Sequence, residues 1–454
     1  MTRAAGSKRS RRRAFATLMV FVVIVFGAIL VATIQAMSLA QASAGRESLA
    51  RVRAYWAARA GVEATMARLE AAREEGDDDD AFHALESMAQ VADGELSGSS
   101  WRIRTTQGKQ EVAGPEDCAA KLNLHRLTPQ QFLEIKPYMG EDVIDSIADW
   151  YDEDDDTRPL GAELGYYAGL PFPFQPRNAP LRSIGELEVV AGVDARDVRG
   201  EDWNLNGVLD PEEDDGDASW PADNADGVLD RGWAGVLTVL SAEDPRGKSG
   251  EDRLDLAAAE ESQVVQRLGV TNEQAAVIID YAQQSSVFSV SEFIRRPLPR
   301  IAQDVARRQG KTQQEIRQAG RMRDLTREQL GLLIDECTVG EPSVLAFVPG
   351  RLNVNTCDPE ALDAIPEIDP SLSDSIISER AGKPQGFASI ADLLDVPGMT
   401  RAQLATISDL LTTRSNVYSV ACSGTDETTG IEVEIVATLD ASTLPASYRE
   451  VRVR

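Results

Sequence analysis

The feature that most constrains this chain is an apolar run from Phe15 to Ile34, which contains no charged residue. About 20 apolar residues are enough to cross the hydrocarbon of a bilayer as a single helix. A basic cluster precedes the run and consists of Lys8, Arg9, Arg11, Arg12 and Arg13. Because cytoplasmic flanks of membrane helices are enriched in Lys and Arg, we expect the N-terminus in the cytoplasm and the remaining 420 residues on the other side.

The residues after the run favour a continuous helix over a cleaved secretory signal. Ala42-Ser43-Ala44 offers a small-residue cleavage pattern, but the apolar run is longer than the roughly 7 to 15 residues of a signal core. From Leu39 to Arg73 there is no proline. Apolar residues recur there at helical spacing, namely Val52, Tyr55, Val62, Met66 and Leu69. A helix that continues to about residue 74 would be roughly 90 Å long at 1.5 Å per residue.

The composition excludes several classes of function. Asp and Glu outnumber Lys and Arg by 74 to 46, which gives a formal net charge of -28. Such a charge disfavours nucleic acid and favours bound cations, although it also serves solubility. The two histidines provide little material for a histidine-rich metal site or a catalytic triad. Four cysteines in an exported chain could form two disulfides, with three possible pairings. We therefore expect a protein that is not an enzyme.

Alternating apolar and polar residues predict strands at both ends of the remaining chain. Residues 101–105 alternate in this way, and so do residues 417–422, 431–438 and 450–454. We predict one small antiparallel sheet whose first strand comes from the start and whose last strands come from the end. The predicted fold class is α+β, with a long N-terminal helix, this sheet and a large, mostly α-helical insert.

The insert contains an internal repeat. Leu122-Asn123 and Leu352-Asn353 each precede a Pro-led helix start, at Thr128-Pro129 and Asp358-Pro359. Thr128 with Gln131, Thr271 with Gln274 and Thr400 with Gln403 have the spacing of capping boxes. Three segments share the pattern of a helix followed by Phe or Leu with Ser, an acidic residue and Leu or Phe: 143–187, 275–293 and 373–393. Short helix hairpins packed on each other are the predicted architecture.

The N-terminal arrangement resembles the type IV pilin superfamily. A basic leader ends at Ala14, Phe15 would begin the mature chain, and the apolar stalk passes into the Ala-, Gly- and Glu-rich segment 55–63. Most members have Gly before the cleaved bond, where this chain has Ala14, and Glu at the fifth mature position, where it has Met19. Loss of that glutamate is typical of the K-type minor pseudopilin of type II secretion. The Asp-Trp acidic run at 149–156 is also similar to this type.

The K-type resemblance implies a function and a location. It implies a minor pseudopilin at the tip of the secretion filament, initiating or capping it, with the I- and J-type minor pseudopilins and the major pseudopilin as partners. It implies cleavage by prepilin peptidase between Ala14 and Phe15, methylation, a single pass through the inner membrane and a periplasmic body. The corresponding division is a leader at 1–14, a stalk helix at 15–75, a pilin-like sheet from 95–124 with 415–454, and an inserted α-domain at 125–414 that includes a loop region at 200–235.

The helix hairpins raise a second hypothesis, that of a membrane-tethered periplasmic DNA receptor. Residues 352–356 through Phe387 and 396–399 resemble the helix-hairpin-helix modules of competence receptors. In such modules backbone N–H groups at helix N-termini approach phosphate. Here the first hairpin reads Pro366-Glu367-Ile368-Asp369, which places two carboxylates where phosphate would lie. Because the chain is acidic and shows no basic stripe, we expect no nucleic acid partner.

The strongest chemical signal is residues 202–213, which match the oxygen pattern of an EF-hand calcium loop. Gly207 lies at the sharp turn of this pattern. The predicted ligands, in order, are Asp202, Asn204, Asn206, the carbonyl of Val208, Asp210 and Glu213. Calcium prefers six to eight such hard oxygens. We therefore predict Ca²⁺ as the cofactor, with an Asn-Gly surface turn as the alternative.

A partial copy of the pattern follows, centred on Gly227. Its candidate ligands are Asp223, Asn224, Asp226 and Asp230. Aligned on the glycine, its first and twelfth positions are Ala222 and Trp233, which offer no side-chain oxygen. The copy would need Asp223 itself or distant acids such as Asp214, Asp215 or Asp217. A plain turn is the alternative here. The acidic run 149–156 with Gly161-Ala162-Glu163 is a further candidate, with a solvated loop as its alternative.

Overall fold

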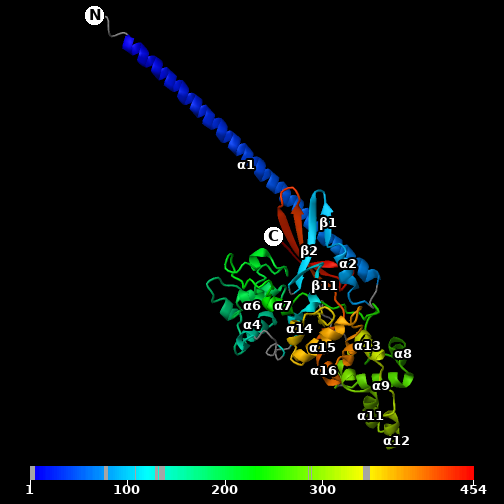
Figure 1. The fold of residues 1–454 in the computed structure, drawn as a ribbon. Helices are drawn as coiled ribbons and strands as arrows, with labels where there is room; N and C mark the ends of the chain where they lie inside the picture. The colour runs from blue at the N-terminus through cyan, green and yellow to red at the C-terminus, as the bar shows by residue number, and fades with distance from the viewer. Residues whose placement is uncertain are drawn as a thin grey trace.

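The computed structural model describes residues 6–75, 80–107, 109–127, 131, 139–284, 286–287, 289–340 and 348–454, and the side chains among these from residue 15 onward. A single long helix, α1 (Gly6–Glu75), carries a wider body at its C-terminal end (Figure 1). The leader residues 1–5, the acidic residues 77–79 and the predicted cap at 128–130 lie outside the described residues.

Helix α1 runs without interruption through both halves predicted from the sequence. All residues from Phe15 to Leu49 are exposed, and contacts with the body begin at Ala50. The segment from Phe15 is the one described helix that is long and apolar enough to cross a membrane. The prediction of one continuous stalk is therefore confirmed.

Small residues decide how closely α1 approaches the sheet. Ala54, Ala57 and Ala58 are fully buried, whereas Val52, which the sequence pattern assigned to the apolar face, is 49% exposed. The alanine side of the helix therefore packs against the sheet together with Val62 and Leu69 of the predicted apolar pattern, whereas Val52 of that pattern does not. A Cβ at Gly424 of the sheet would lie 2.1 Å from the Ala54 carbonyl oxygen, so only glycine fits there.

The sheet is antiparallel and joins both ends of the chain, as predicted. Its order is β1 (Asp93–Leu96), β2 (Ser99–Gln107), β11 (Val417–Asp426), β12 (Glu432–Asp440) and β13 (Ser447–Val453), with β3 (Gln110–Ala113) beside β2 and β4 (Glu116–Asp117) beside β11. Ile103 pairs with Cys422 at the junction of the two ends. Buried side chains of α1 and the sheet form one hydrophobic core.

Three modules make up the insert, and each is closed by a pair of two-residue parallel strands. The pairs are β5 (Leu122–Asn123) with β6 (Leu237–Thr238), β7 (Leu254–Asp255) with β8 (Cys337–Thr338), and β9 (Leu352–Asn353) with β10 (Leu411–Thr412). In every pair an Asn or Asp lies opposite a Thr. The sequence pattern identified Leu-Asn in the first and third modules. The first of these strands lies in its own pair and not in the antiparallel sheet.

Short helices fill the modules. The first module contains η2 (Leu124–Arg126), α4 (Glu141–Tyr151), α5 (Leu164–Tyr167), η3 (Ile184–Val189), α6 (Ala195–Arg199), η4 (Pro211–Glu213) and α7 (Gly232–Val236). The second contains α8 (Glu261–Leu268), α9 (Asn272–Ala282), α10 (Ser291–Arg295), α11 (Leu298–Arg308), α12 (Gln313–Ala319) and α13 (Arg327–Glu336). The third contains α14 (Pro359–Asp363), α15 (Pro370–Ala381), η5 (Ile390–Asp395) and α16 (Arg401–Ile407). Outside the modules, α2 (His83–Ala89) follows α1, and η1 (Cys118–Ala120) follows β4. One hydrophobic core is continuous through all three modules.

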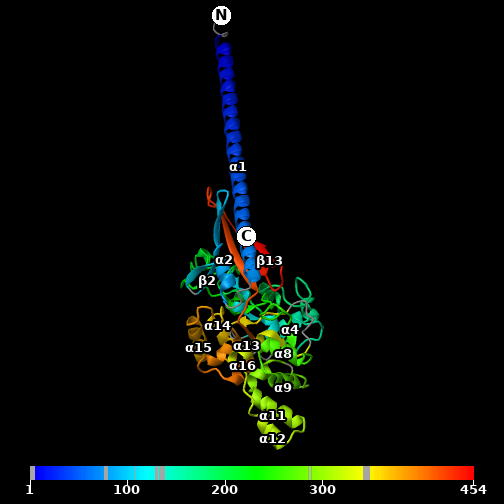
Figure 2. The same cartoon turned by 90° about the vertical axis from the view of Figure 1, so that its right-hand side faces the viewer.

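Local signals and long-range contacts fix the modules. The capping boxes at Thr271 and Thr400 are both formed. Asp117 at the end of β4 accepts hydrogen bonds from Asn353, Thr356 and Ser415, which ties the sheet to the third module. The four cysteines are buried and free, so neither of the two possible disulfides is formed. Helices α11 and α12 lie at the end of the molecule opposite the N-terminus in both views (Figures 1 and 2).

Candidate metal-binding loops

The loop at residues 202–213 follows α6, ends in η4 and is bound to the antiparallel sheet. The Thr106 N–H donates to the Gly207 carbonyl at 2.8 Å, and the Leu209 N–H donates to the Thr106 hydroxyl at 2.9 Å. The Arg452 guanidinium of β13 donates to the carbonyls of Asn204 (3.2 Å) and Leu205 (3.0 Å). The loop therefore has a fixed position on the body of the protein.

The first acidic residue folds the loop around itself. The Asp202 carboxylate accepts from the backbone N–H of Asn206 at 3.0 Å and of Gly207 at 3.1 Å. Leu205 and Gly207 have φ angles of 56° and 72°, in the left-handed region. Glycine satisfies the second of these turns without strain, because it has no Cβ.

The remaining oxygen-bearing side chains converge on the same loop. The amide nitrogens of Asn204 and Asn206 donate to Asp210 Oδ2 at 2.6 and 3.1 Å. Asn206 also donates to Glu434 of β12 at 2.8 Å. Glu213 closes the loop by accepting from the N–H groups of Trp203 (2.9 Å) and Asp210 (3.2 Å). The structure thus gathers five of the predicted ligand side chains and adds Glu434, which is distant in sequence.

Crowding of these carboxylates changes their acidity. Burial, together with the nearby Asp202 and Asp210, raises the pKa of Glu213 to about 7. Burial also raises the pKa of Asp202, Asp210 and Glu434. A divalent cation would offset the repulsion between ionised carboxylates at this position, so the electrostatics favour one.

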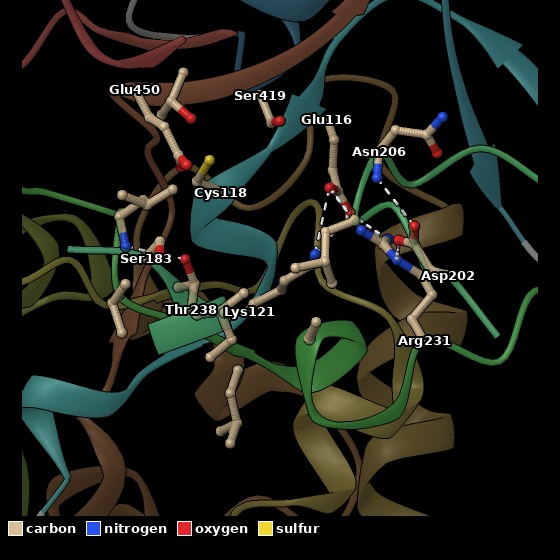
Figure 3. Close-up of a pocket in the computed structure, with 18 of the residues that line it drawn as sticks. Glu116, Cys118, Lys121, Ser183, Asp202, Asn206, Arg231, Thr238, Ser419 and Glu450 are labelled. Carbon is tan, nitrogen blue, oxygen red and sulfur yellow. Dashed lines mark hydrogen bonds and ion pairs between the residues drawn. The ribbon is translucent and has the colours of Figure 1, made fainter. Parts of the chain in front are cut away.

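A buried ion-pair network holds Asp202 from the other side. Arg231 Nε lies 3.5 Å from Asp202, and its terminal nitrogens bind Glu116 of β4 at 2.5 and 3.0 Å (Figure 3). Lys121 pairs with Glu116 at 3.2 Å. Burial alone would raise the pKa of Glu116, but the positive charges of Arg231 and Lys121 lower this pKa to about 2. No sequence pattern indicated this network, because Glu116 and Arg231 are far apart in the chain.

The network lines a cavity of about 350 Å³ between the first module and the sheet. The labelled side chains of Glu116, Lys121 and Asp202 meet around Arg231 in its wall (Figure 3). Arg452 also lines this cavity, so the residue that holds the first loop belongs to the same polar lining as the ion-pair network.

The second loop repeats the backbone of the first. Ala225 and Gly227 have φ angles of 52° and 72°, which match Leu205 and Gly207. The N–H of Gly227 donates to a carboxylate oxygen of Asp214 at 2.9 Å, as the N–H of Gly207 does to Asp202.

Glu201 closes the second loop. Its two oxygens accept from the N–H groups of Asn224 (3.1 Å) and Asp230 (3.2 Å). This matches the role of Glu213 in the first loop. Asp214 and Glu201 therefore take the first and twelfth positions that Ala222 and Trp233 leave empty. The sequence pattern included Asp214 among its candidates and missed Glu201, which precedes the loop in the chain.

Asp223 lies at the turn that precedes the second loop, and its role as a ligand stays a prediction. Its carboxylate accepts from the N–H groups of Asp215 (3.1 Å), Gly216 (2.9 Å) and Ala225 (2.7 Å). It thus shapes the turn that brings Asp214 to the second loop, while Asn224, Asp226 and Asp230 remain in the loop itself.

A third group of oxygens lies around α4. Asp149 is fully buried and Glu163 is 4% exposed. Among the described residues, Glu163 Oε1, Asp152 Oδ1 and Asn178 Oδ1 are buried without a hydrogen-bond partner. Arg158 donates to both Asp149 and Asp152. Burial and the nearby Asp149 and Asp152 raise the pKa of Glu163. The solvated-loop alternative does not account for buried oxygens without donors.

The oxygen atoms of the first loop fit a hard cation, provided that the amide groups of Asn204 and Asn206 rotate. Within the described ranges, no three Asp, Glu, His or Cys side chains are close enough to hold a metal ion by themselves. An ion in the first loop would therefore use the amide oxygens of Asn204 and Asn206 and the carbonyl of Val208 as well. Because the amide nitrogens face Asp210 in this structure, both amides would have to rotate. Mixed carboxylate, amide and carbonyl oxygens are the ligands that calcium prefers.

The hairpin of the third module has a carboxylate at its helix N-terminus. Asp369 accepts from the N–H of Leu372 at 3.0 Å and so occupies the start of α15. A phosphate would need these N–H groups free. This geometry disfavours the DNA-receptor hypothesis.

Comparison with known proteins gives two matches to family models. Residues 107–200 match the first domain of "Type II secretion system (T2SS), protein K", and residues 350–412 match the helix-hairpin-helix motif. The type II secretion system protein K of Aeromonas hydrophila is 40% identical over 65 residues, or 14% of this chain. The matched part covers 20% of that relative.

A chain in the crystal structure of the GspK-GspI-GspJ complex of the enterotoxigenic Escherichia coli type 2 secretion system aligns with 90% of this chain and 99% of its own length. The identity is 13% and the TM-score 0.46. The family match at residues 107–200 confirms the K-type resemblance inferred from the sequence.

Proposed function

We propose that this chain, which carries the protein K domain of type II secretion systems over residues 107–200, is a minor pseudopilin at the tip of the secretion filament. It would initiate or cap the filament that drives proteins across the outer membrane. The observation that carries this proposal is the form of the molecule, a bare apolar stalk that ends in a body much wider than the stalk (Figure 1).

The stalk supports assembly through helix packing. From Phe15 to Leu49 it makes no buried contact with the body, and its large apolar side chains are mostly more than half exposed. Such a surface is stable only in a bilayer or against other apolar helices. We propose that it lies in the inner membrane before assembly, with the N-terminus in the cytoplasm and the body in the periplasm. Afterwards it packs against the I- and J-type minor pseudopilins and the major pseudopilin.

The inserted modules support a terminal position. The second and third modules lie toward the end opposite the stalk in both views, whereas the first module lies beside the sheet (Figures 1 and 2). A further subunit stacked on this end would meet the modules rather than a free stalk. Met19, where most pilins have a glutamate, fits a subunit with no neighbour above it.

Calcium would have a structural role in this protein. When bound, it would supply positive charge to the buried carboxylates of the two loops and the α4 cluster. In the first loop, Asp202, Asn204, Asn206, Asp210 and Glu213 would hold it with the Val208 carbonyl. An ion that binds only the folded state raises the free energy of unfolding.

Copurification tests the proposed assembly. The full-length chain is expressed with the I- and J-type minor pseudopilins of the same system, solubilised in detergent and captured through a C-terminal tag, in calcium and in chelator. We expect a stoichiometric complex in calcium and less of it in chelator. Val23→Asp, in the exposed stalk, should abolish the complex, whereas Arg102→Gln, on an exposed part of the sheet, should leave it intact. If wild type forms no complex in calcium, the tip proposal is wrong.

The DNA-receptor hypothesis has its own test. It requires binding of the full-length chain to duplex DNA that weakens steeply with salt. We expect no binding even at low salt, because Asp369 occupies the start of α15. Tight binding that Asp369→Asn strengthens would favour the receptor instead.

A further inference from the structure

Residues 295–323 form a strongly basic stretch within an acidic chain. They contain nine Arg or Lys and two carboxylates, Asp304 and Glu315, whereas the whole chain has a net charge of -28. The expectation of a chain without a basic stripe was therefore wrong for this part of the second module. The cause is that the total charge conceals how the charges are distributed.

The fold places this stretch at one end of the molecule. It spans α11, α12 and the turns on either side, and α12 packs against α11. Both views show this pair at the end farthest from the N-terminus (Figures 1 and 2). Along the axis of α1, the pair therefore points away from the membrane proposed to hold the stalk.

Packing of α11 forces the cations outward. Leu298, Ile301 and Val305 of α11 are buried, as is Ile316 of α12. The polar sides of both helices therefore face solvent. The exposed cations of α11, α12 and the turns that follow these two helices, here named the basic end, are Arg300, Arg307, Arg308, Lys311, Arg317, Arg321 and Arg323.

Most of the basic end is not neutralised by the protein itself. Arg307 pairs with Asp304 at 3.0 Å, and Arg308 donates to Gln284. Within the described ranges the other five members make no ion pair. Their charges are thus available to an external partner.

The surface of the basic end indicates which partner it fits. Among the described residues 295–323 no large apolar side chain is exposed, so it lacks the apolar anchors that protein interfaces use. Cavities of about 350 and 500 Å³ are lined by other parts of the chain, which disfavours a single small anion here. The cations instead project from two helices and two turns of a protruding end. Such an arrangement can contact a plane of repeated phosphates. The planar Arg guanidinium is well suited to this contact, because it can donate two hydrogen bonds to one phosphate.

We propose that the basic end binds the anionic phospholipid headgroups of a membrane that faces the one holding the stalk. The rest of the chain carries excess negative charge and is repelled by such a surface, so only this end can approach it. Contact through the basic end would orient the molecule with its axis across the space between two membranes. This inference relies on the membrane location of the stalk in the proposed function.

Vesicle binding tests the inference with the full-length chain. The protein is held by its stalk in phosphatidylcholine nanodiscs and floated with vesicles of phosphatidylglycerol and phosphatidylcholine, or of phosphatidylcholine alone, at low salt. We expect binding to the anionic vesicles only, weakening as salt shortens the Debye length. The triple variant Lys311→Gln, Arg317→Gln, Arg321→Gln should bind about a hundredfold more weakly, since each cation contributes about fivefold.

A matched control removes three exposed cations elsewhere: Arg102→Gln, Arg182→Gln and Arg196→Gln. This variant should bind within about threefold of wild type, because these side chains lie on the sheet and the first module. Equal losses in the two variants, or equal binding to both kinds of vesicle, would overturn the inference. So would binding to duplex DNA or polyglutamate without binding to anionic vesicles, which would assign the basic end to nucleic acid or an acidic protein.

Failure of the proposed function is recognised separately. A chain that leaves the nanodisc contradicts the membrane location of the stalk. A chain that stays in the nanodisc, assembles with the other pseudopilins and ignores anionic vesicles contradicts the present inference alone. Unchanged melting temperatures of both triple variants would show that their folds are intact.

Discussion

The two loops that follow α6 share one backbone path but are built from different parts of the chain. In the first loop, one continuous stretch supplies both the turn and its carboxylates, from Asp202 to Glu213. In the second, Asp214 and Glu201 supply the two end positions from outside the pattern. The first is bound to the sheet through Thr106 and Arg452, whereas much of the second is exposed. The same backbone conformation can thus form with or without a complete local motif. Because the first loop is held by the sheet, it should bind calcium more tightly than the second.

The largest effect is expected from removing two carboxylates of the first loop. Asp202→Asn with Glu213→Gln keeps the side-chain shapes but removes two negative charges. At calcium one hundred times above the dissociation constant, this loop should contribute about 2.7 kcal/mol to the free energy of unfolding. Thermal unfolding with and without chelator should show that this contribution is lost.

The control for that experiment is Glu212→Gln with Asp217→Asn, two exposed neighbours with the same change of charge. The calcium-induced rise in melting temperature should remain. An unchanged rise in the Asp202 and Glu213 variant would mean that the first loop does not bind the ion.

The next largest effect is expected in how the free energy of unfolding of the calcium-free protein depends on pH. Because the folded pKa of Glu213 is about 7 and that of an ordinary Glu is 4.5, the folded state retains a proton between these values. The free energy of unfolding should therefore fall as pH rises from about 4.5 to 7 and stay low above it. The expected loss is of the order of 2 kcal/mol. Denaturant titrations at several pH values should show a flatter profile for Glu213→Gln, and an identical profile would contradict the assignment.

Removing Arg452, which holds the first loop on the sheet, should weaken calcium binding in the first loop but not in the second. Arg452→Gln removes the donors to the Asn204 and Leu205 carbonyls. Since a hydrogen bond to a charged group contributes about 1.5 to 3 kcal/mol, we expect at least tenfold weaker calcium binding in the first loop. Calorimetric titration should detect no change in the second loop. A weakening of both ions would show that Arg452 acts on the whole module.

Glu201→Gln addresses the second loop alone. It keeps the shape of the side chain but removes the charge that closes this loop. The number of bound ions should fall by one, and calcium at ten times the dissociation constant should stabilise the protein by about 1.4 kcal/mol less. Unchanged stoichiometry would leave the second loop as a plain turn.

The smallest effect concerns strain at the matching turns. Ala225 and Leu205 both have positive φ angles, which glycine adopts more easily. Ala225→Gly should raise the free energy of unfolding by about 0.5 kcal/mol. Leu205→Gly should give no such gain, because the leucine side chain is partly buried and lies near Gly185. Chemical denaturation of both variants would compare them, and equal gains would argue against the packing of Leu205.

The sequence predicted the stalk, the sheet and several helix starts, but it did not predict every buried face or the basic end. Local rules were sufficient for the stalk, the capping boxes at Thr271 and Thr400, and the strands of the sheet, because these depend on periodicity and neighbouring residues. They failed for Val52, since the alanine side of α1 could be identified only from the close approach of Gly424. They also failed for the basic end, which the total charge concealed.

The sequence by itself determined the continuous apolar helix, the α+β class, the repeat in the insert and the oxygen pattern of the first loop. The tertiary structure alone decided that Glu201 and Asp214 complete the second loop and that Arg231 joins Asp202 to Glu116. It also left the oxygens of Asp152, Glu163 and Asn178 buried without donors. The physical reason is distance along the chain. Helix periodicity and turn chemistry act over a few residues, whereas burial, ion pairing and carboxylate repulsion depend on residues that only folding brings together.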